Sequence, residues 1–244
     1  MNNLFAVTSG KGGVGKSTVA SSLAGAAEML GKKTLLIDLD EGLRCLDMML
    51  SMSESIVLDL SDAFNGHDIN HAIYPVPSHP LLYLLPAPAF YGRIDEGAFG
   101  EFIRESVSHF DIVIVDFPAG IDLRLYKQLP DTTRFLTVCN PDPVSVRDAS
   151  VVSDRLSEIG KTDNRLILNR FCMDYIKSGV YKGIDDIIDL SRIRLAGVVP
   201  TDNQILLAQA KGKLIKRGKA AKSFTRIMKR LLGEDIPLPK PKKI

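Results

Sequence analysis

The sequence predicts an α/β fold, with a single doubly wound and mostly parallel sheet flanked by helices. Short apolar runs lack the alternation of a half-exposed strand, which suits strands buried on both faces. Longer amphipathic or polar segments separate these runs, and a glycine-rich loop joins the first run to the first such segment. Strands that alternate with helices pair in parallel through right-handed crossovers, so these observations together favour a doubly wound domain.

Seven apolar runs are the expected strands, at residues 4–8, 34–37, 81–85, 112–115, 135–138, 166–168 and 195–199. The helices expected between them cover residues 16–30, 97–110, 144–159 and 202–210. The uncharged stretch 69–92 contains five prolines, which would break a membrane-spanning helix. We therefore expect a proline-rich loop there that leads into the third strand.

The composition is that of a soluble globular protein, because 45% of the 244 residues are hydrophobic and 25% are charged. The cysteines, Cys45, Cys139 and Cys172, are far apart and form no C-x-x-C pair, which disfavours a metal cluster and fits a reduced, cytoplasmic setting. His67 and His71 have the spacing of a helical metal pair, but a third ligand is not evident. A pair of surface histidines is the other interpretation. Residues 1–10 lack the pattern of a signal peptide.

The glycine-rich loop carries the main functional signal. Residues 9–18 read SGKGGVGKST and satisfy the phosphate-loop pattern G-x-x-x-x-G-K-[ST]. Glycines allow positive φ and close approach of backbone N–H groups to phosphate oxygens, while the following helix adds a favourable dipole. We expect Lys16 to bind β- and γ-phosphate oxygens and the Ser17 hydroxyl to bind Mg²⁺. The nucleotide-binding set expected in this loop is Gly10, Gly12, Gly13, Val14, Gly15, Lys16, Ser17 and Thr18.

Acidic residues follow two of the expected strands. The segment LLIDLD places Asp38 and Asp40 at the carboxyl end of the second strand, and DIVIVDFPAGID places Asp116 after another apolar run. Ligands of parallel sheets bind at this edge. Asp116 suits a Walker B residue that holds Mg²⁺ through water, although an aspartate that opens a turn gives the same local pattern. The loop and both acidic segments together indicate a Mg²⁺–nucleotide site.

Three segments resemble the MinD/ParA family of P-loop ATPases, in which the Walker A loop is deviant. They are K-G-G-V-G-K-S-T at 11–18, D-L-D-E-G-L-R-C-L-D at 38–47 and D-F-P-A-G at 116–120. The resemblance is greatest to MinD-like members, covers about residues 1–238, and implies the P-loop NTPase fold of that family. It implies that Lys11 reaches across a nucleotide-sandwiched dimer to the partner's phosphates, so that catalysis depends on dimerisation. The expected catalytic residues are Lys11, Lys16 and Asp40. The alternative for Lys11 is an ordinary solvated lysine of the loop.

The same resemblance implies roles for the acidic residues. Asp38 would belong to the Mg²⁺ ion and its waters, which gives the metal set Ser17, Asp38 and Asp116, and Asp40 would position or activate the attacking water. Gly120 would donate its backbone N–H to the γ-phosphate. Cys45 stands where the family usually has Asn, so the sequence departs from the family pattern at one polar contact of this switch.

Later segments resemble the family less closely. Asn169, followed by Arg170, ends an expected strand where family members often use the Asn on the adenine edge, and Pro200 and Asp202 resemble a segment beside the base. Residues 140–142 (N-P-D) and 145–148 (S-V-R-D) resemble segments near the dimer face. An ordinary turn is the alternative for each.

The net charge of +2 combines an acidic body with a basic end, because residues 211–244 contain 12 Lys and Arg but 2 Asp and Glu. Residues 219–232 separate apolar from basic side chains on a helical wheel. This segment is either the last core helix, as the family register favours, or a helix on an anionic membrane. We expect a P-loop ATPase domain over 1–233 and a basic Pro/Lys-rich tail over 234–244. Three prolines in that tail disfavour a dedicated C-terminal membrane helix and leave weak contacts with anionic membrane or DNA.

The resemblance implies a Mg²⁺-dependent ATPase that binds ATP and ADP and hydrolyses ATP to ADP and phosphate. ATP would promote a homodimer, and hydrolysis would release it. Such a switch would position a division site, a flagellum or a similar structure through an unidentified protein activator or cargo. The alternatives are a ParA-like DNA-partitioning ATPase that binds non-specific DNA, an accessory ATPase for metal or cofactor insertion, and a small-molecule kinase. A cytoplasmic protein is expected, with peripheral attachment to the inner membrane face as a variant.

Overall fold

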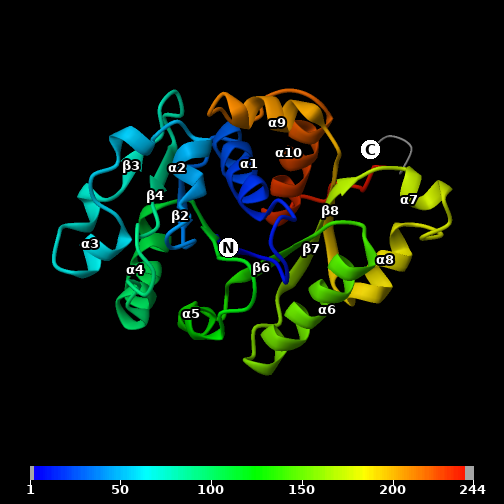
Figure 1. The fold of residues 1–244 in the computed structure, drawn as a ribbon, viewed down its shortest axis with the longest axis horizontal. Helices are drawn as coiled ribbons and strands as arrows, with labels where there is room; N and C mark the ends of the chain where they lie inside the picture. The colour runs from blue at the N-terminus through cyan, green and yellow to red at the C-terminus, as the bar shows by residue number, and fades with distance from the viewer. Residues whose placement is uncertain (1–2, 240–244) are drawn as a thin grey trace.

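A computed structural model describes residues 3–239, and its centre is an eight-stranded sheet (Figure 1). The strand order is β3-β4-β2-β5-β1-β6-β7-β8, and all neighbouring pairs are parallel except β3 with β4. The strands are β1 (Leu4–Thr8), β2 (Thr34–Asp38), β3 (Tyr74–Pro75), β4 (Leu82–Leu85), β5 (Ile112–Asp116), β6 (Arg134–Cys139), β7 (Asn164–Phe171) and β8 (Arg194–Pro200). The predicted α/β class with a mostly parallel sheet is confirmed.

Helices cover both faces of the sheet (Figure 1). On one face α1 packs against α10, and on the other α4 packs against α5 and α6 against α8. The helices are α1 (Lys16–Met29), α2 (Cys45–Met49), α3 (Leu60–Phe64), α4 (Glu96–His109), α5 (Leu123–Gln128), α6 (Pro143–Glu158), α7 (Asp174–Lys177), α8 (Ile184–Ser191), α9 (Asn203–Ala210) and α10 (Lys219–Leu231). Two single turns, η1 (Ser53–Ser55) and η2 (Ile69–His71), complete the set.

The continuous hydrophobicity of the strands follows from burial on both faces. Successive side chains of a strand point to opposite faces, so Phe5 and Val7 of β1 join the core beneath α1 and α10. Leu4 and Ala6 join the core formed with α4, α5 and α6. A strand with one solvent face would carry polar residues at every second position, which β1 does not.

The predicted strands and long helices lie within three residues of the observed ones. The elements not predicted from the sequence are β3 and the helices α2, α3, α5, α7 and α8, each of eight residues or fewer. Segments this short give too few turns for a helical period to be recognised. The predicted proline-rich loop is correct in outline but contains β3, where Pro75 is tolerated because β3 is an edge strand.

The basic segment near the C-terminus is a core helix, as the family register favours. In α10 the side chains of Ala220, Phe224, Ile227 and Met228 are buried, and the helix packs on α1 and β8. Residues 234–239 form no helix, whereas the last five residues of the predicted tail, 240–244, lie outside the described residues. Within residues 3–239, no helix combines the length and the apolar character needed to cross a bilayer.

Candidate functional site

The site lies where three neighbouring strands, β1, β2 and β5, reach the same edge of the sheet. Asp116 at the end of β5 is the register partner of Asp38 on β2 and of Val7 on β1. The glycine-rich loop, residues 9–15, leaves β1 at this edge and enters α1 at Lys16. The strand order therefore brings the loop and two of the three predicted carboxylates together.

The backbone of the loop requires glycine at several positions. Gly13 and Gly15 have φ of +78° and +88°, a region that other residues avoid. A Cβ atom on Gly15 would lie 2.5 Å from Nδ2 of Asn169, and one on Gly10 would lie 2.7 Å from the carbonyl oxygen of Asp148. Because Gly15 is the N-cap of α1 and supplies no side-chain acceptor, the first N–H groups of α1 are left for an anion.

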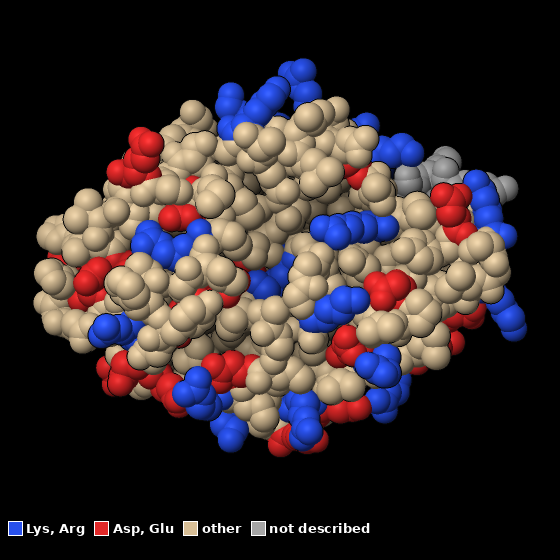
Figure 2. Space-filling view, in the orientation of Figure 1, with Lys and Arg blue, Asp and Glu red and all other residues tan. Residues whose placement is uncertain are grey.

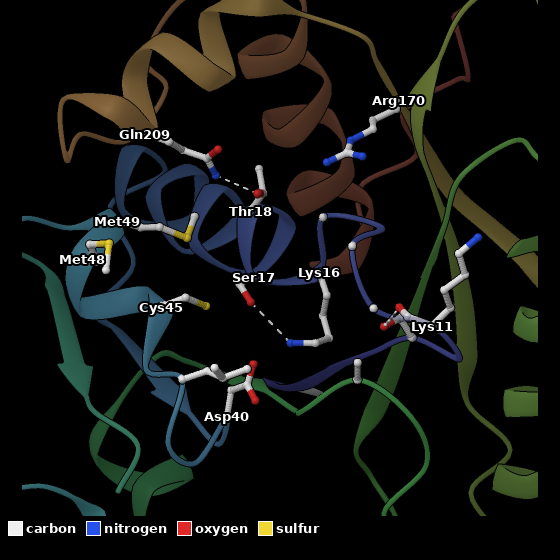
Figure 3. A pocket seen from close by; sticks show the side chains of 16 residues that line it. Lys11, Lys16, Ser17, Thr18, Asp40, Cys45, Met48, Met49, Arg170 and Gln209 are labelled. Carbon is white, nitrogen blue, oxygen red and sulfur yellow. Dashed lines mark hydrogen bonds between the residues drawn. The ribbon is translucent and has the colours of Figure 1, made fainter. Parts of the chain in front are cut away.

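A cleft of about 560 Å³ opens above the loop (Figure 3). The predicted residues that line it are Lys11, Gly12, Gly13, Gly15, Lys16, Ser17, Thr18, Asp40 and Arg170. Residues with no nucleotide contact predicted from the sequence also line the cleft: Ser9, Leu43, Cys45, Met48, Met49, Ala119 and Gln209. A cleft of this size, with a glycine loop and the start of a helix on one side, suits a nucleotide.

Lys16 and Asp116 form a buried ion pair beneath the cleft. The Lys16 ammonium donates to Oδ1 of Asp116 at 2.7 Å and to the Ser17 hydroxyl at 3.4 Å. The side chain of Asp116 is fully buried and that of Lys16 is 7% exposed. Oδ2 of Asp116 is also buried and has no hydrogen-bond partner among the described residues. An orphaned carboxylate oxygen beside a serine hydroxyl is the donor set that Mg²⁺ prefers, so these residues fit the predicted ion.

Asp38 shares this environment. Its carboxylate accepts from the backbone N–H groups of Asp40 at 2.9 Å and Leu46 at 3.2 Å, which ties the strand end to the start of α2. Burial, reinforced by the neighbouring charge of Asp116, raises the pKa of Asp38 to about 7. Burial likewise raises the pKa of Asp116. Both carboxyls are buried and have raised pKa values. A cation bound at this edge would stabilise their ionised forms, so the site favours a cation.

Lys11 is placed differently from Lys16. Its side chain is 44% exposed, and its ammonium lies 3.8 Å from Oδ1 of Asp142, the residue that caps α6. In Figure 3 it points away from Lys16. Asp40 is half-buried and lines the cleft, and its predicted role in positioning or activating the attacking water stays a prediction. The Gly120 N–H donates to the carbonyl oxygen of Ser9 at 3.1 Å, so this hydrogen bond must break before the N–H can donate to a phosphate.

Two of the four residues predicted to contact the base, Asn169 and Asp202, form side-chain hydrogen bonds within the protein. The Asn169 amide donates to the carbonyl of Val14 at 2.8 Å and so supports the loop from below. Asp202 caps α9 and also accepts from Ala220 N–H at 3.2 Å, which joins the starts of α9 and α10. Pro200 is buried at the end of β8, and neither it nor Asp202 lines the cleft. Their base contacts therefore stay predictions.

Two residues with no role predicted from the sequence fix segments at the site: Gln209 lines the cleft, whereas Glu41 follows Asp40 in the sequence and does not line it. Gln209 of α9 donates from Nε2 to the Thr18 hydroxyl at 2.7 Å and so fixes α9 against α1 (Figure 3). The Glu41 carboxylate accepts from three consecutive backbone N–H groups, at residues 92–94. The position of Glu41 inside the acidic segment was a usable signal, whereas Gln209 is remote in sequence and carried none.

A competing metal site is absent from residues 3–239, where no three His, Cys, Asp or Glu side chains gather to hold an ion. His67 is exposed and His71 lies on η2, so the two do not form the helical pair considered above. The three cysteines are free. Burial raises the pKa of Cys45 to about 11 and that of Cys139 to about 12, which keeps both thiols protonated.

Comparisons with known proteins agree with this geometry. The family model described as "CobQ/CobB/MinD/ParA nucleotide binding domain" matches residues 5–215. The septum site-determining protein MinD of Thermotoga maritima is 33% identical over 98% of this chain and 91% of its own length. The structure of the Aquifex aeolicus cell division protein MinD is 31% identical, with a TM-score of 0.87 over 98% of this chain and 100% of that one. MinD in the Aquifex aeolicus MinC:MinD complex is 32% identical, with a TM-score of 0.88 over 98% and 99%. The chain therefore belongs to the MinD/ParA family of P-loop nucleotide-binding proteins, and its similarity to MinD extends over nearly its whole length.

Proposed function

We propose that this protein is a MinD-like, Mg²⁺-dependent ATPase that hydrolyses ATP to ADP and phosphate and acts as a dimerisation switch. The observation that carries the proposal is the contrast between its two loop lysines. Lys16 is buried against Asp116 inside the cleft, whereas Lys11 is exposed and turned toward Asp142. A second subunit placed over the cleft can receive Lys11, while Lys16 serves its own subunit.

The loop and α1 supply most of the phosphate contacts. The glycine-rich loop, residues 10–15, presents backbone N–H groups, and the uncapped start of α1 adds its dipole to the charge of Lys16. Ser17, Asp38 and Asp116 would hold Mg²⁺, Asp116 through water and Asp38 at the ion and its waters, and the bound ion would supply positive charge beside the β- and γ-phosphates. Asn169, Arg170, Pro200 and Asp202 remain the proposed contacts of the base.

Asp40 orients the attacking water from the mouth of the cleft. Asp40 lies two residues after the end of β2, and the hydrogen bond from its N–H to Asp38 couples its position to the metal site. Lys11 from the second subunit adds positive charge where negative charge grows on the transferring phosphoryl oxygens, as an arginine finger does. Hydrolysis therefore requires the dimer, and loss of the γ-phosphate removes the contact that holds it.

The switch serves to position a cellular structure, and the division site is the best-supported candidate. Relatives of similar length carry the name septum site-determining protein, and one such structure is a complex of MinD with MinC. A protein of the MinC kind is accordingly the partner we propose. The free cysteines fit the reducing cytoplasm, where weak attachment to anionic membrane remains compatible with the basic end of the chain.

Paired variants test the switch. With ATP and Mg²⁺, Asp40→Ala is expected to remain dimeric in sedimentation velocity and to release no phosphate. Lys11→Ala is expected to remain monomeric and inactive while it still binds nucleotide. Lys127→Ala, on an exposed face of α5, is the matched control and is expected to behave as wild type. Dimerisation and turnover at the wild-type level in Lys11→Ala would contradict the proposed role of Lys11, and normal turnover in Asp40→Ala would contradict that of Asp40.

A further inference from the structure

A second cleft, of about 610 Å³, lies on the far side of α9 from the nucleotide cleft. We name it the α9 groove. One wall is α9 with the loop that follows it, residues 211–217, and the other is formed by residues 76–79 with the end of α2 at Leu50 and Ser51. Figure 2 shows Lys and Arg side chains along the upper edge of the molecule, where α9 lies in Figure 1.

The rim of the α9 groove is strongly cationic. Lys211, Lys213, Lys216 and Arg217 line it and are exposed. None of the four forms an ion pair within residues 3–239, and no Asp or Glu lines the groove. His79 also lines it, but the imidazole of His79 is buried and bonded to Glu28. Four like charges in one short loop repel one another, so a ligand with several negative charges is favoured here.

The base of the groove is apolar and firmly built. Leu50, Val76 and Leu214 lie in it and are almost fully buried, while Leu207 is 53% exposed. The loop after α9 packs closely on the end of α2, because a Cβ atom on Gly212 would overlap the Ser51 hydroxyl. The base of the groove is therefore a rigid apolar surface.

We propose that the α9 groove binds an acidic, amphipathic peptide segment of a partner protein. Glu or Asp side chains of that segment meet the four cations, and one or two apolar side chains lie on the base beside Leu207. A DNA backbone would satisfy the cations but has no apolar group for the base. An anionic bilayer is flat and favours protruding side chains, whereas the apolar base of the α9 groove is recessed. The combination of charge and concavity thus favours a peptide.

The groove also has a route to the nucleotide cleft. α9 carries Leu207 into the groove and Gln209, through its bond to Thr18, into the cleft. α2 does the same, with Met49 in the cleft and Leu50 in the groove. A peptide that shifts either helix will change nucleotide affinity, and by linkage nucleotide will change peptide affinity by the same factor.

The test uses the full chain and fluorescein-labelled peptides in which one or two leucines are set among glutamates, read by fluorescence anisotropy. Binding is expected, and the variant Lys211→Glu/Lys213→Glu is expected to weaken it by at least about tenfold, since each exposed charge pair contributes modestly and reversal adds repulsion. The variant Arg104→Glu/Lys127→Glu changes the net charge equally on the opposite face of the sheet and is expected to keep wild-type affinity. Leu207→Ser is expected to weaken the leucine-containing peptides alone.

Other outcomes overturn the proposal. Equal loss in both charge-reversal variants would mean that net charge, and not the groove, attracts the peptide. Equal affinity for a peptide of glutamates without leucine would remove the role of the apolar base. Absence of peptide binding, with binding instead to vesicles containing phosphatidylglycerol or to duplex DNA that Lys211→Glu/Lys213→Glu abolishes, would assign the groove to a membrane or to nucleic acid. ADP binding at wild-type level shows that each variant is folded, so a failure of the ATPase proposal remains distinguishable.

Discussion

The ion pair between Lys16 and Asp116 predicts an effect of Lys16 on folding as well as on nucleotide binding. The two side chains are buried and bonded at 2.7 Å, and Asp38 lies beside them as the register partner of Asp116. Replacement of Lys16 by Met keeps an apolar stem of similar shape but leaves two buried carboxyls without their cation. We therefore expect Lys16→Met to destabilise the protein in the absence of any nucleotide.

The free energy of unfolding lost in Lys16→Met follows from the buried ion pair in two ways. Removal of one partner from a buried ion pair typically costs about 3–5 kcal/mol. Alternatively, the abandoned carboxyl takes up a proton, and this costs at most about 4 kcal/mol at pH 7 for a group whose ordinary pKa is 3.8, because burial already raises the pKa of Asp116 in the wild type. The agreement of the two values gives an expected loss of about 4 kcal/mol from the free energy of unfolding. That is a large share of the 5–15 kcal/mol typical of a domain.

The assay is urea unfolding at pH 7 without nucleotide and without Mg²⁺. The stability of Lys16→Met is compared with that of the double variant Lys16→Met/Asp116→Asn. Removal of both charges leaves one buried carboxyl, Asp38, in place of two, and Asp38 keeps its two backbone N–H donors, so the double variant is expected to recover much of the stability lost in Lys16→Met. Asp116→Asn alone frees Lys16 and is expected to bind Mg²⁺-free ADP more tightly than wild type. A Lys16→Met protein as stable as wild type, or a double variant less stable than Lys16→Met, would refute the reasoning.

Further predictions concern neighbouring residues. Asp202→Ala removes a cap of α9 and the bond to Ala220, so we expect a loss of about 2 kcal/mol in thermal unfolding, and a wild-type melting temperature would count against this role. With the pKa of Cys45 raised to about 11, only about one thiol in a thousand is ionised at pH 8. Alkylation of Cys45 by iodoacetamide, followed by mass spectrometry, should therefore rise about tenfold per pH unit up to pH 10, and a plateau below pH 9 would disagree. Glu41→Ala should speed hydrogen exchange at residues 92–94, where unchanged protection would show that Glu41 does not hold that loop.

The part of the site that the sequence predicted is the part encoded by neighbouring residues. The loop from Gly10 to Thr18 is contiguous, and its chemistry follows from glycine, lysine and serine at fixed spacing. The approach of Asp38 to Asp116 was also predictable, because parallel strands end at a common edge. Both inferences needed only local pattern and strand order.

The contacts that sequence reasoning missed depend on how separate layers pack. Asn169 supports the loop through the Val14 carbonyl, a contact across 155 positions, and Gln209 bonds Thr18 across 191 positions. Neither side chain differs from an ordinary polar residue in its own segment. Their partners become evident only once β7 is placed beside the loop and α9 beside α1. The α9 groove was missed for the same reason, since its basic loop was considered only as part of a C-terminal charge.

Three groups expected to contact phosphate have internal partners in this conformation. Lys16 donates to Asp116, Lys11 lies by Asp142, and the Gly120 N–H donates to Ser9. In the proposed mechanism, nucleotide binding exchanges these three internal contacts for external ones, so the net affinity is smaller than the contacts alone would give. The same exchange would make the state of the protein sensitive to the γ-phosphate, because Lys11 and Gly120 would return to their internal partners once it leaves. The proposed switch needs this property, since two arrangements of similar free energy respond to one ligand, whereas a site with unpaired donors would bind tightly and change little.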